Sequence, residues 1–324
     1  MKSLPIKSLL LFSASLLPAS LYAATHTITP DDIMRFESLS KPVIADTGKT
    51  LAVEVSPDRG DSRGLVKNLT TKKEFSVKGG SKPKVSHDGR YVAFVDKLPL
   101  LTTEMASKKE KKKLKSGMVL VDTNTGKELR YERVKSFEFN ETGSHIAIWY
   151  EAEDKKKETK AKDNAETSKK DIKVDDYDKG STVELVALNQ LKSITFKDVT
   201  AFNFDKSGKH FALAINNVET DKHELRLVSL ANNTAKIVHS LKQQLGSLAL
   251  SDDGKYLGFT FGNANQAPFG REYALSLYNI ESGNISTTPT SKDWTLNRYA
   301  SLRFSDDSQR LFFGRVPQVS QQIE

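Results

Sequence analysis

The sequence contains no cysteine, which excludes disulfide bonds and thiolate metal sites in this chain of 324 residues. Its stability must therefore come from an ordinary hydrophobic core. With 37% hydrophobic residues it can build one, because a chain of this length buries roughly three quarters of its unfolded surface. Glycine-rich phosphate loops are also absent, and no cluster of His, Asp and Glu has metal-ligand spacing. We therefore expect neither a metal nor another cofactor.

Long apolar runs are scarce, and the clearest one lies at the N-terminus between Leu9 and Leu17. Two lysines precede it, and small residues ending in Ala23-Ala24 follow it. The run is too short to cross a membrane, and this order of features is that of a secretory signal peptide. We predict a signal peptide over residues 1–23 with cleavage near Ala23, no membrane span, and an exported protein that is periplasmic or extracellular.

The positive charge is concentrated rather than spread over the chain. The formal net charge is +8, but Lys2 and Lys7 lie in the predicted signal peptide, and the run SKKEKKKLK at 107–115 holds six lysines and one glutamate. The remainder is close to neutral. Aromatic residues for base stacking are not interleaved with these lysines. The pattern is typical of a solvated basic loop, and we expect no nucleic-acid partner.

Sustained helical periodicity is missing beyond residue 40, apart from the lysine-rich tracts. The N-terminal segment 24–40 contains one short predicted helix at 31–36, DDIMRF. Thr29 is a good N-cap, Pro30 suits the first helical position, and acidic residues occupy the first turn. Everything after this segment favours strands.

A repeat of glycine-centred turns runs through the chain. Each copy has a polar residue, a Gly or Ser after it, two further residues, and then an apolar–small–apolar or all-apolar triplet. Successive turns are 41 to 65 residues apart. The six copies are ADTGKTLAV (45–53), SHDGRYVAF (86–94), NETGSHIAI (140–148), DKSGKHFAL (205–213), SDDGKYLGF (251–259) and SDDSQRLFF (305–313).

Each repeat predicts four antiparallel strands. An alternating strand such as KPKV (82–85) precedes the turn, and a second such as Tyr91–Val95 follows it. A third, such as MVLVD (118–122), ends in another turn that leads to a fourth. Four strands per repeat of this length are typical of a β-propeller blade. We predict an all-β β-propeller over residues 41–324, with about five complete blades plus a partial sixth in an incomplete ring.

Residues 60–64, GDSRG, match the G-x-S-x-G pattern of a serine-hydrolase nucleophile elbow. That elbow requires a strand ending at the first glycine and a helix after the serine. Here four residues separate the strand Leu51–Val55 from Gly60, and two short strands are predicted in 65–77. We therefore place Ser62 in the loop between the second and third strands of the first blade and expect it not to be a nucleophile.

The turn motif S-x-D-G-x-x-apolar-A-F resembles the TolB-type propeller repeat. The order of features narrows the resemblance: the helix DDIMRF, the first blade PVIADTGKTLAVEVSPDRGDSRGLVKNL (42–69), then KPKVSHDGRYVAFVD (82–96), a lysine-rich insertion, and DWTLNRYASLRFSDDSQRLFFGRVP (293–317). Together these resemble the N-terminal propeller of exported serine peptidases of the prolyl oligopeptidase family.

The resemblance implies a function, with one departure from the family. In that family an α/β-hydrolase domain with a Ser-Asp-His triad follows the propeller, and the propeller restricts which peptides reach it. This sequence ends at Glu324 without a hydrolase domain. We therefore expect a truncated, non-catalytic domain that gates and orients peptide substrates for a hydrolase outside this chain, with no catalytic residues of its own. The alternative is a periplasmic TolB-like propeller that acts as a protein-interaction scaffold.

Length variation falls on one predicted face. The connections between second and third strands are 56–64, 97–116, 151–181 and 262–272, and we expect them on the face opposite the tight turns, where a protein partner would bind. Two of them, 97–116 and 151–181, are charged insertions. The tract 151–179 carries ten acids and nine lysines, so disorder is expected there, with partial helix or a docking arm as alternatives. His145 and His210 share one repeat position and are expected to pack at blade interfaces or rims.

Overall fold

The structure, a computed structural model, describes residues 28–153, 179–217, 219–262, 273–289, 291, 293–296 and 301–317. The first element is the short helix α1 (Pro30–Met34). Thr29 caps it: the Thr29 hydroxyl accepts from the Asp32 amide, and the Asp32 carboxylate accepts from the Thr29 amide at 2.9 Å. The short helix predicted at the N-terminus is thus confirmed, with the expected cap.

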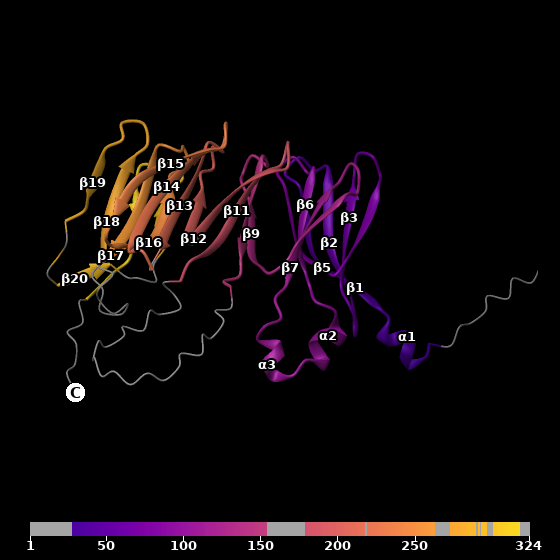
Figure 1. Cartoon of the computed structure of the whole chain (residues 1–324). Helices are drawn as coiled ribbons and strands as arrows, with labels where there is room; N and C mark the ends of the chain where they lie inside the picture. Colours follow the sequence, from indigo (N-terminus) through magenta and orange to yellow (C-terminus); the bar gives the residue numbers. More distant parts are fainter. Residues whose placement is uncertain are drawn as a thin grey trace, which may run out of the picture.

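Antiparallel sheets follow one another along the chain from indigo to yellow, side by side (Figure 1). The first two sheets contain four strands each, in chain order. The first holds β1 (Glu37–Ile44), β2 (Thr50–Pro57), β3 (Arg63–Asn68) and β4 (Glu74–Lys78). The second holds β5 (Gly80–Val85), β6 (Tyr91–Asp96), β7 (Gly117–Asp122) and β8 (Glu128–Tyr131).

The third and fourth repeats share one seven-stranded sheet. The sharing comes from β12, a 13-residue strand whose first half pairs with β11 and whose second half pairs with β13. The pairing shifts register near Asp198, whose φ of 57° bends the strand. The strands are β9 (Val134–Phe139), β10 (His145–Tyr150), β11 (Ser181–Ala187), β12 (Lys192–Phe204), β13 (His210–Asn217), β14 (Lys222–Ser229) and β15 (Thr234–Leu241).

The fifth repeat forms another four-stranded sheet, and the sixth forms two short strand pairs. The fifth comprises β16 (Gln244–Leu250), β17 (Tyr256–Gly262), β18 (Tyr273–Asn279) and β19 (Ile285–Thr287). In the sixth, β20 (Trp294–Leu296) pairs with β23 (Arg315–Pro317), and β21 (Arg303–Phe304) pairs with β22 (Leu311–Phe312).

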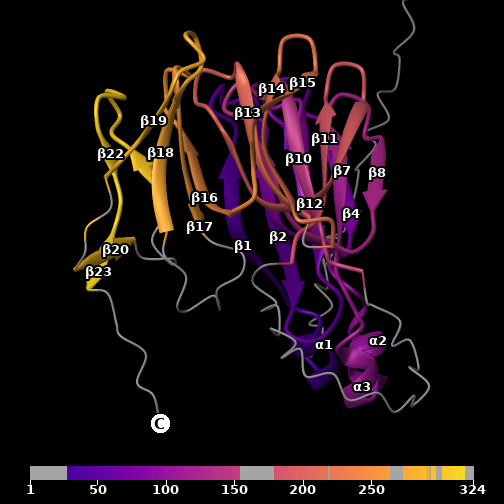
Figure 2. The same cartoon turned by 60° about the vertical axis from the view of Figure 1, so that its left-hand side comes forward.

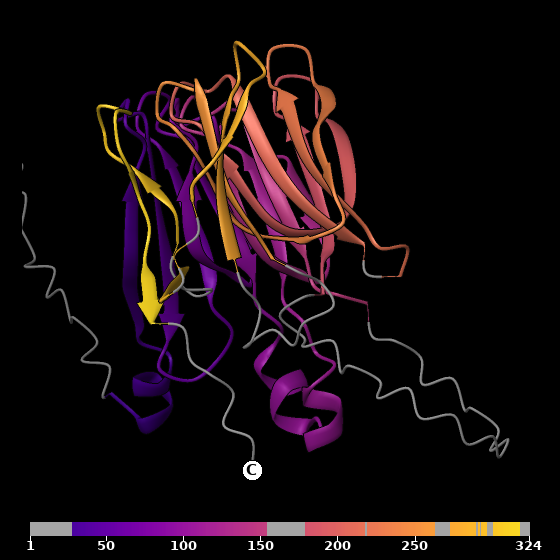
Figure 3. The ribbon, with the colours of Figure 1, turned by 90° about the vertical axis from the view of Figure 1, so that its left-hand side faces the viewer.

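The core lies between the sheets. Each of the five buried hydrophobic clusters combines residues from two successive repeats, and Figures 2 and 3 show the sheets stacked face against face with their strands upright. For example, Val66 and Val77 of the first repeat pack with Phe94 of the second. Each sheet is thus buried by its neighbours, as in a β-propeller.

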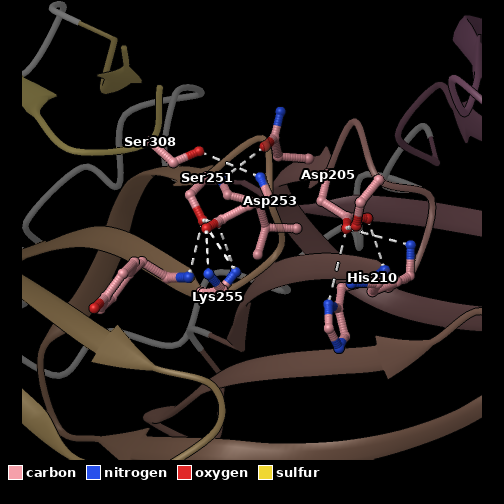
Figure 4. Close-up of polar contacts among 11 residues, drawn as sticks. Asp205, His210, Ser251, Asp253, Lys255 and Ser308 are labelled. Carbon is pink, nitrogen blue, oxygen red and sulfur yellow. Dashed lines mark hydrogen bonds and ion pairs between the residues drawn. The ribbon is translucent and has the colours of Figure 1, made fainter. Parts of the chain in front are cut away.

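Polar side chains hold the tight turns between first and second strands (Figure 4). The Ser251 hydroxyl donates to Asp253 at 2.7 Å and accepts from the Tyr256 amide at 2.9 Å. In the fourth repeat the buried Asp205 carboxylate accepts from the His210 amide instead, at 2.7 Å. Gly254 has φ of +71°, which side chains rarely adopt, so the repeated glycine is a requirement of the turn.

The prediction of an all-β β-propeller of four-stranded antiparallel blades is confirmed by this arrangement. Two details differ from expectation. The third and fourth blades are joined through β12 rather than separate. In the sixth repeat the strand before the turn, expected at SLRF (301–304) by analogy with KPKV (82–85), is regular only over Arg303–Phe304. Ring closure and blade number stay predictions.

Candidate partner-binding face

The connections between second and third strands emerge from the side of the sheets opposite the tight turns, because antiparallel strands alternate in direction. We call this side the loop face. Its described parts are 58–62, 97–116, 151–153, 179–180 and 219–221. Helices α1, α2 and α3 lie beyond this end of the strands in all three views (Figures 1, 2 and 3). The tract 154–178 and residues 263–272 lie outside the described residues, so the predictions made for them stay predictions.

The insertion 97–116 contains two helices that the repeat analysis did not locate, α2 (Leu100–Met105) and α3 (Lys108–Lys111). A capping box starts α3: the Ser107 hydroxyl accepts from the Glu110 amide at 3.3 Å, and the Glu110 carboxylate accepts from the Ser107 amide at 2.8 Å. The Ser-x-x-Glu pattern is a recognised signal for a helix start. It was present in the sequence within the lysine-rich run.

The first blade anchors this insertion at two points. The Asp61 carboxylate accepts a hydrogen bond from the Leu100 amide at 2.7 Å, so it holds the first residue of α2. Arg59 forms an ion pair with Glu104 at 3.3 Å. Both anchors belong to the loop 58–62, which contains the first three residues of the GDSRG sequence. The acidic residue of that sequence therefore positions a neighbouring loop.

A cavity of about 600 Å³ lies between the loop and the insertion. Its lining residues are Ser56, Gly60, Asp61, Ser62, Gly79, Lys97, Leu98, Leu100, Thr103, Lys111, Leu114 and Ser116. Ser62 is 7% exposed, its Oγ has no hydrogen-bond partner, and no histidine lines the cavity. A strand, β3, begins at Arg63 directly after it. Ser62 thus has no helix directly after it and no base hydrogen-bonded to its Oγ, unlike the serine of a nucleophile elbow.

A buried carboxylate lies close to this cavity. Glu54 of β2 is 2% exposed and accepts hydrogen bonds from Lys41 Nζ and Lys97 Nζ, both at 2.7 Å, and from the Lys82 amide at 3.1 Å. Burial raises the pKa of Glu54, but the two ammonium groups and the amide outweigh it and lower that pKa to about 2. Lys97 also lines the cavity, so the ion pair with Glu54 holds a residue of the cavity wall in place.

Both Lys41 and Lys82 precede a proline and have positive φ, 51° and 47°. Each is located at a bulge of a first strand, where the register shifts against the second strand. The Lys-Pro pair repeated in the first two blades is the sequence signal for this buried cluster, and it lies outside the glycine-centred turn motif.

The outer surface of the insertion combines apolar and basic side chains. Leu101 is 68% exposed and Met105 is 84% exposed, although both are large hydrophobic residues. The adjoining lysines are 108, 109, 111, 112 and 113. Around α1, Ile33 and Phe36 are also more than half exposed. Apolar and basic side chains are thus exposed together at this end of the molecule, which makes it the candidate partner-binding face.

The two histidines of the repeat lie at the junction of the third and fourth blades, on the opposite face. His145 is 5% exposed; its Nε2 lies 2.8 Å from Asn233 Oδ1 and its Nδ1 lies 2.8 Å from Ser144 Oγ. The Nδ1 atom of His210 is buried and lies 3.9 Å from the Asp205 carboxylate. Burial lowers the pKa of both histidines. Among the described residues, no group of three or more His, Asp and Glu could hold a metal.

No protein-family model matches the sequence, and no curated protein matches it either. Solved structures with a similar fold exist. The β-propeller domain of the Trilobed protease from Pyrococcus furiosus is 12% identical and aligns over 87% of this chain and 78% of its own, with a TM-score of 0.40. TolB from Acinetobacter baumannii is 13% identical and aligns over 79% of this chain and 55% of its own, with a TM-score of 0.32.

The acylaminoacyl peptidase of Pyrococcus horikoshii is 11% identical and aligns over 83% of this chain, with a TM-score of 0.38. The aligned region spans only 42% of that peptidase. At these identities the likeness concerns the fold alone. Within the described part of the chain, none of the helices combines the length and apolar character needed to cross a bilayer.

Proposed function

We propose that this chain is the non-catalytic propeller of an exported serine peptidase of the prolyl oligopeptidase family. In this role the loop face contacts a separate hydrolase domain, and the propeller gates and orients the peptides that reach the triad of that domain. The resemblance of the turn motif and the order of sequence features support the family. The sequence of the N-terminal 23 residues supports export.

The observation that carries the proposal is the exposed apolar surface of α2. Met105 and Leu101 are exposed on α2, and Asp61 of the first blade holds the start of this helix in place. Exposing two large apolar side chains to water has no benefit for the isolated domain. Covering them by a partner would remove this apolar area from water, and the flanking lysines would select a partner with acidic groups.

The test begins with the reading frame that follows residue 324. The proposal expects about 200 to 300 further residues with alternating strands and helices, containing a strand, G-x-S-x-G and a helix, followed by Asp and His. Two closing blades followed by a stop codon would contradict it and favour the TolB-like interaction scaffold. A fluorophosphonate probe should label the encoded hydrolase and leave this chain, including Ser62, unlabelled.

Docking can then be measured directly with the encoded hydrolase domain and this chain. The double variant Leu101→Ser, Met105→Ser should weaken their association by about tenfold or more, since a few buried apolar residues dominate such interfaces. The matched control is Ile237→Ser on β15, which changes an apolar residue that is 54% exposed outside the loop face. Equal affinity of the double variant and the wild type would overturn the assignment of the loop face.

Gating has a separate readout. Adding this chain should slow cleavage of long peptides by the hydrolase domain and leave short peptides unaffected, because the propeller limits access by size. If long and short peptides respond alike, the propeller binds the hydrolase without gating it.

A further inference from the structure

A second concave region lies between the third and fourth blades, on the side of the tight turns. It has a volume of about 890 Å³. One wall is the connection between β11 and β12 together with the start of β12, with Asn189 and Lys192. The other is the connection between β14 and β15, with Asn232 and Asn233. Lys209 and the two repeat histidines complete the lining. We call this region the inter-blade groove. It is separate from the loop face.

The charge of the inter-blade groove has one sign. Lys192 and Lys209 both line it, and no Asp or Glu does. Asp205, which lies 3.9 Å from the lining residue His210, is 1% exposed, and its carboxylate already accepts from the Lys209 and His210 amides, at 3.2 and 2.7 Å. Its charge is therefore engaged in the turn beneath the groove. A concave surface with two ammonium groups and no carboxylate in its lining favours an anion.

A hydrogen bond holds the side chain of one lining residue, Asn233, in place. Asn233 Oδ1 can only accept, so His145 Nε2 carries the proton in their 2.8 Å contact. His145 Nδ1 then accepts from the Ser144 hydroxyl at 2.8 Å. Asn233 lines the groove, and with its oxygen held by His145 its amide N–H groups are the donors of this side chain. His145 and Asn233 come from different blades, so the groove is formed where these blades meet.

We infer that the inter-blade groove binds a small molecule bearing a carboxylate or phosphate group, with Lys192 and Lys209 supplying charge and the Asn233 amide donating a hydrogen bond. Charge-assisted hydrogen bonds from ammonium groups are stronger than neutral ones, and the amide adds direction. Carboxylate and phosphate share the oxygen acceptors that this donor set recognises. The site does not depend on the proposed function.

Calorimetric titration of the whole chain tests this inference. Citrate is the carboxylate probe and inorganic phosphate is the second arm, with sodium chloride added to keep the ionic strength equal. Saturable one-to-one binding of either anion is expected, and the tighter arm identifies the acceptor group. Absence of saturable binding in both arms would overturn the inference.

Variants locate the binding. The pair Lys192→Gln, Lys209→Gln should weaken it by about tenfold or more, because two charged donors are lost. Asn233→Asp keeps the size of the side chain and places a negative charge on the wall, so it should abolish binding. Lys127→Gln, an exposed lysine at the corresponding connection of the second blade, should bind as the wild type does. Unchanged binding in the lysine pair would show that the anion does not bind in the inter-blade groove.

Discussion

At the scale of single residues, Glu54 is a buried charge whose partners come from three separate segments. Lys41 belongs to β1, Lys82 to β5 and Lys97 to the segment after β6. An unpaired carboxylate at this depth would be strongly destabilising, whereas this one has two ammonium partners and one amide. The cluster therefore ties the first blade to the second, and one of its members, Lys97, lines the cavity.

The pH dependence of stability follows from Glu54. Its pKa is lowered from the usual 4.5 to about 2, so its contribution is fully present above pH 4.5 and is lost as the pH falls toward 2. That shift corresponds to roughly 3 kcal/mol. We expect Glu54→Gln to lower the free energy of unfolding by about 2 to 3 kcal/mol at pH 7. Urea denaturation at pH 7 and between pH 5 and pH 3 measures both effects.

A control for this prediction is Glu37→Gln. Glu37 is exposed and pairs with Arg63, so its removal should change the free energy of unfolding little. The acid dependence of Glu54→Gln should also be flatter than that of the wild type. If the free energy of unfolding depends on pH in the same way for Glu54→Gln and the wild type, Glu54 does not titrate as described.

At the scale of elements, the insertion 97–116 shows how a polar segment becomes ordered. Neither of its helices contains a buried residue. Order comes from the cap at Ser107, from the Asp61 contact to Leu100 and from the ion pair between Lys115 and Glu151 at 3.5 Å. Short helices of this kind are marginal by themselves, so a single cap has a large local effect.

Ser107→Ala should unfold α3 locally without destabilising the propeller. The cap stabilises the helix by about 1 kcal/mol, so its loss increases the unfolded population of the helix about fivefold. Limited trypsin digestion should therefore cut within Lys108–Lys113 several times faster, while the melting temperature stays the same. Ser107→Asp retains a capping oxygen and should be cut at the rate of the wild type. A large drop in melting temperature would instead show that α3 supports the blades.

At the scale of the whole molecule, stability resides between sheets. Phe211 of β13 is fully buried, and its ring centroid lies 4.6 Å from that of Phe204 within the cluster that joins the third and fourth blades. Each blade exposes a hydrophobic face when its neighbour is absent. Neighbouring blades should therefore unfold together.

Phe211→Ala should lower the free energy of unfolding by about 3 to 5 kcal/mol, because it removes a buried ring and leaves a cavity. Phe312→Ala is the matched control: Phe312 is 55% exposed on β22, and its loss should cost about 0.5 kcal/mol or less. Denaturation followed by tryptophan fluorescence compares the two. Similar effects of both substitutions would contradict the placement of the core between blades.

The sequence predicted the repeat well because local rules govern it. Gly254 and its equivalents need positive φ, and Asp205 and Ser251, which start two of the turns, accept from backbone amides only a few residues away. The candidate sites were less predictable. Asn233 and His145 are hydrogen-bonded although they lie 88 residues apart in the sequence, and Asp61 and Leu100 lie 39 residues apart. No local sequence pattern predicts such a pair.

The sequence alone therefore determined the hairpins, the four-stranded repeat and the short N-terminal helix, since turn chemistry, alternation and capping act within a few residues. Tertiary structure decided which polar side chains became partners, how β12 merged two blades into one sheet, and where the cavity and the inter-blade groove lie. Those features depend on how successive sheets stack, because the burial of one sheet by the next brings distant residues together.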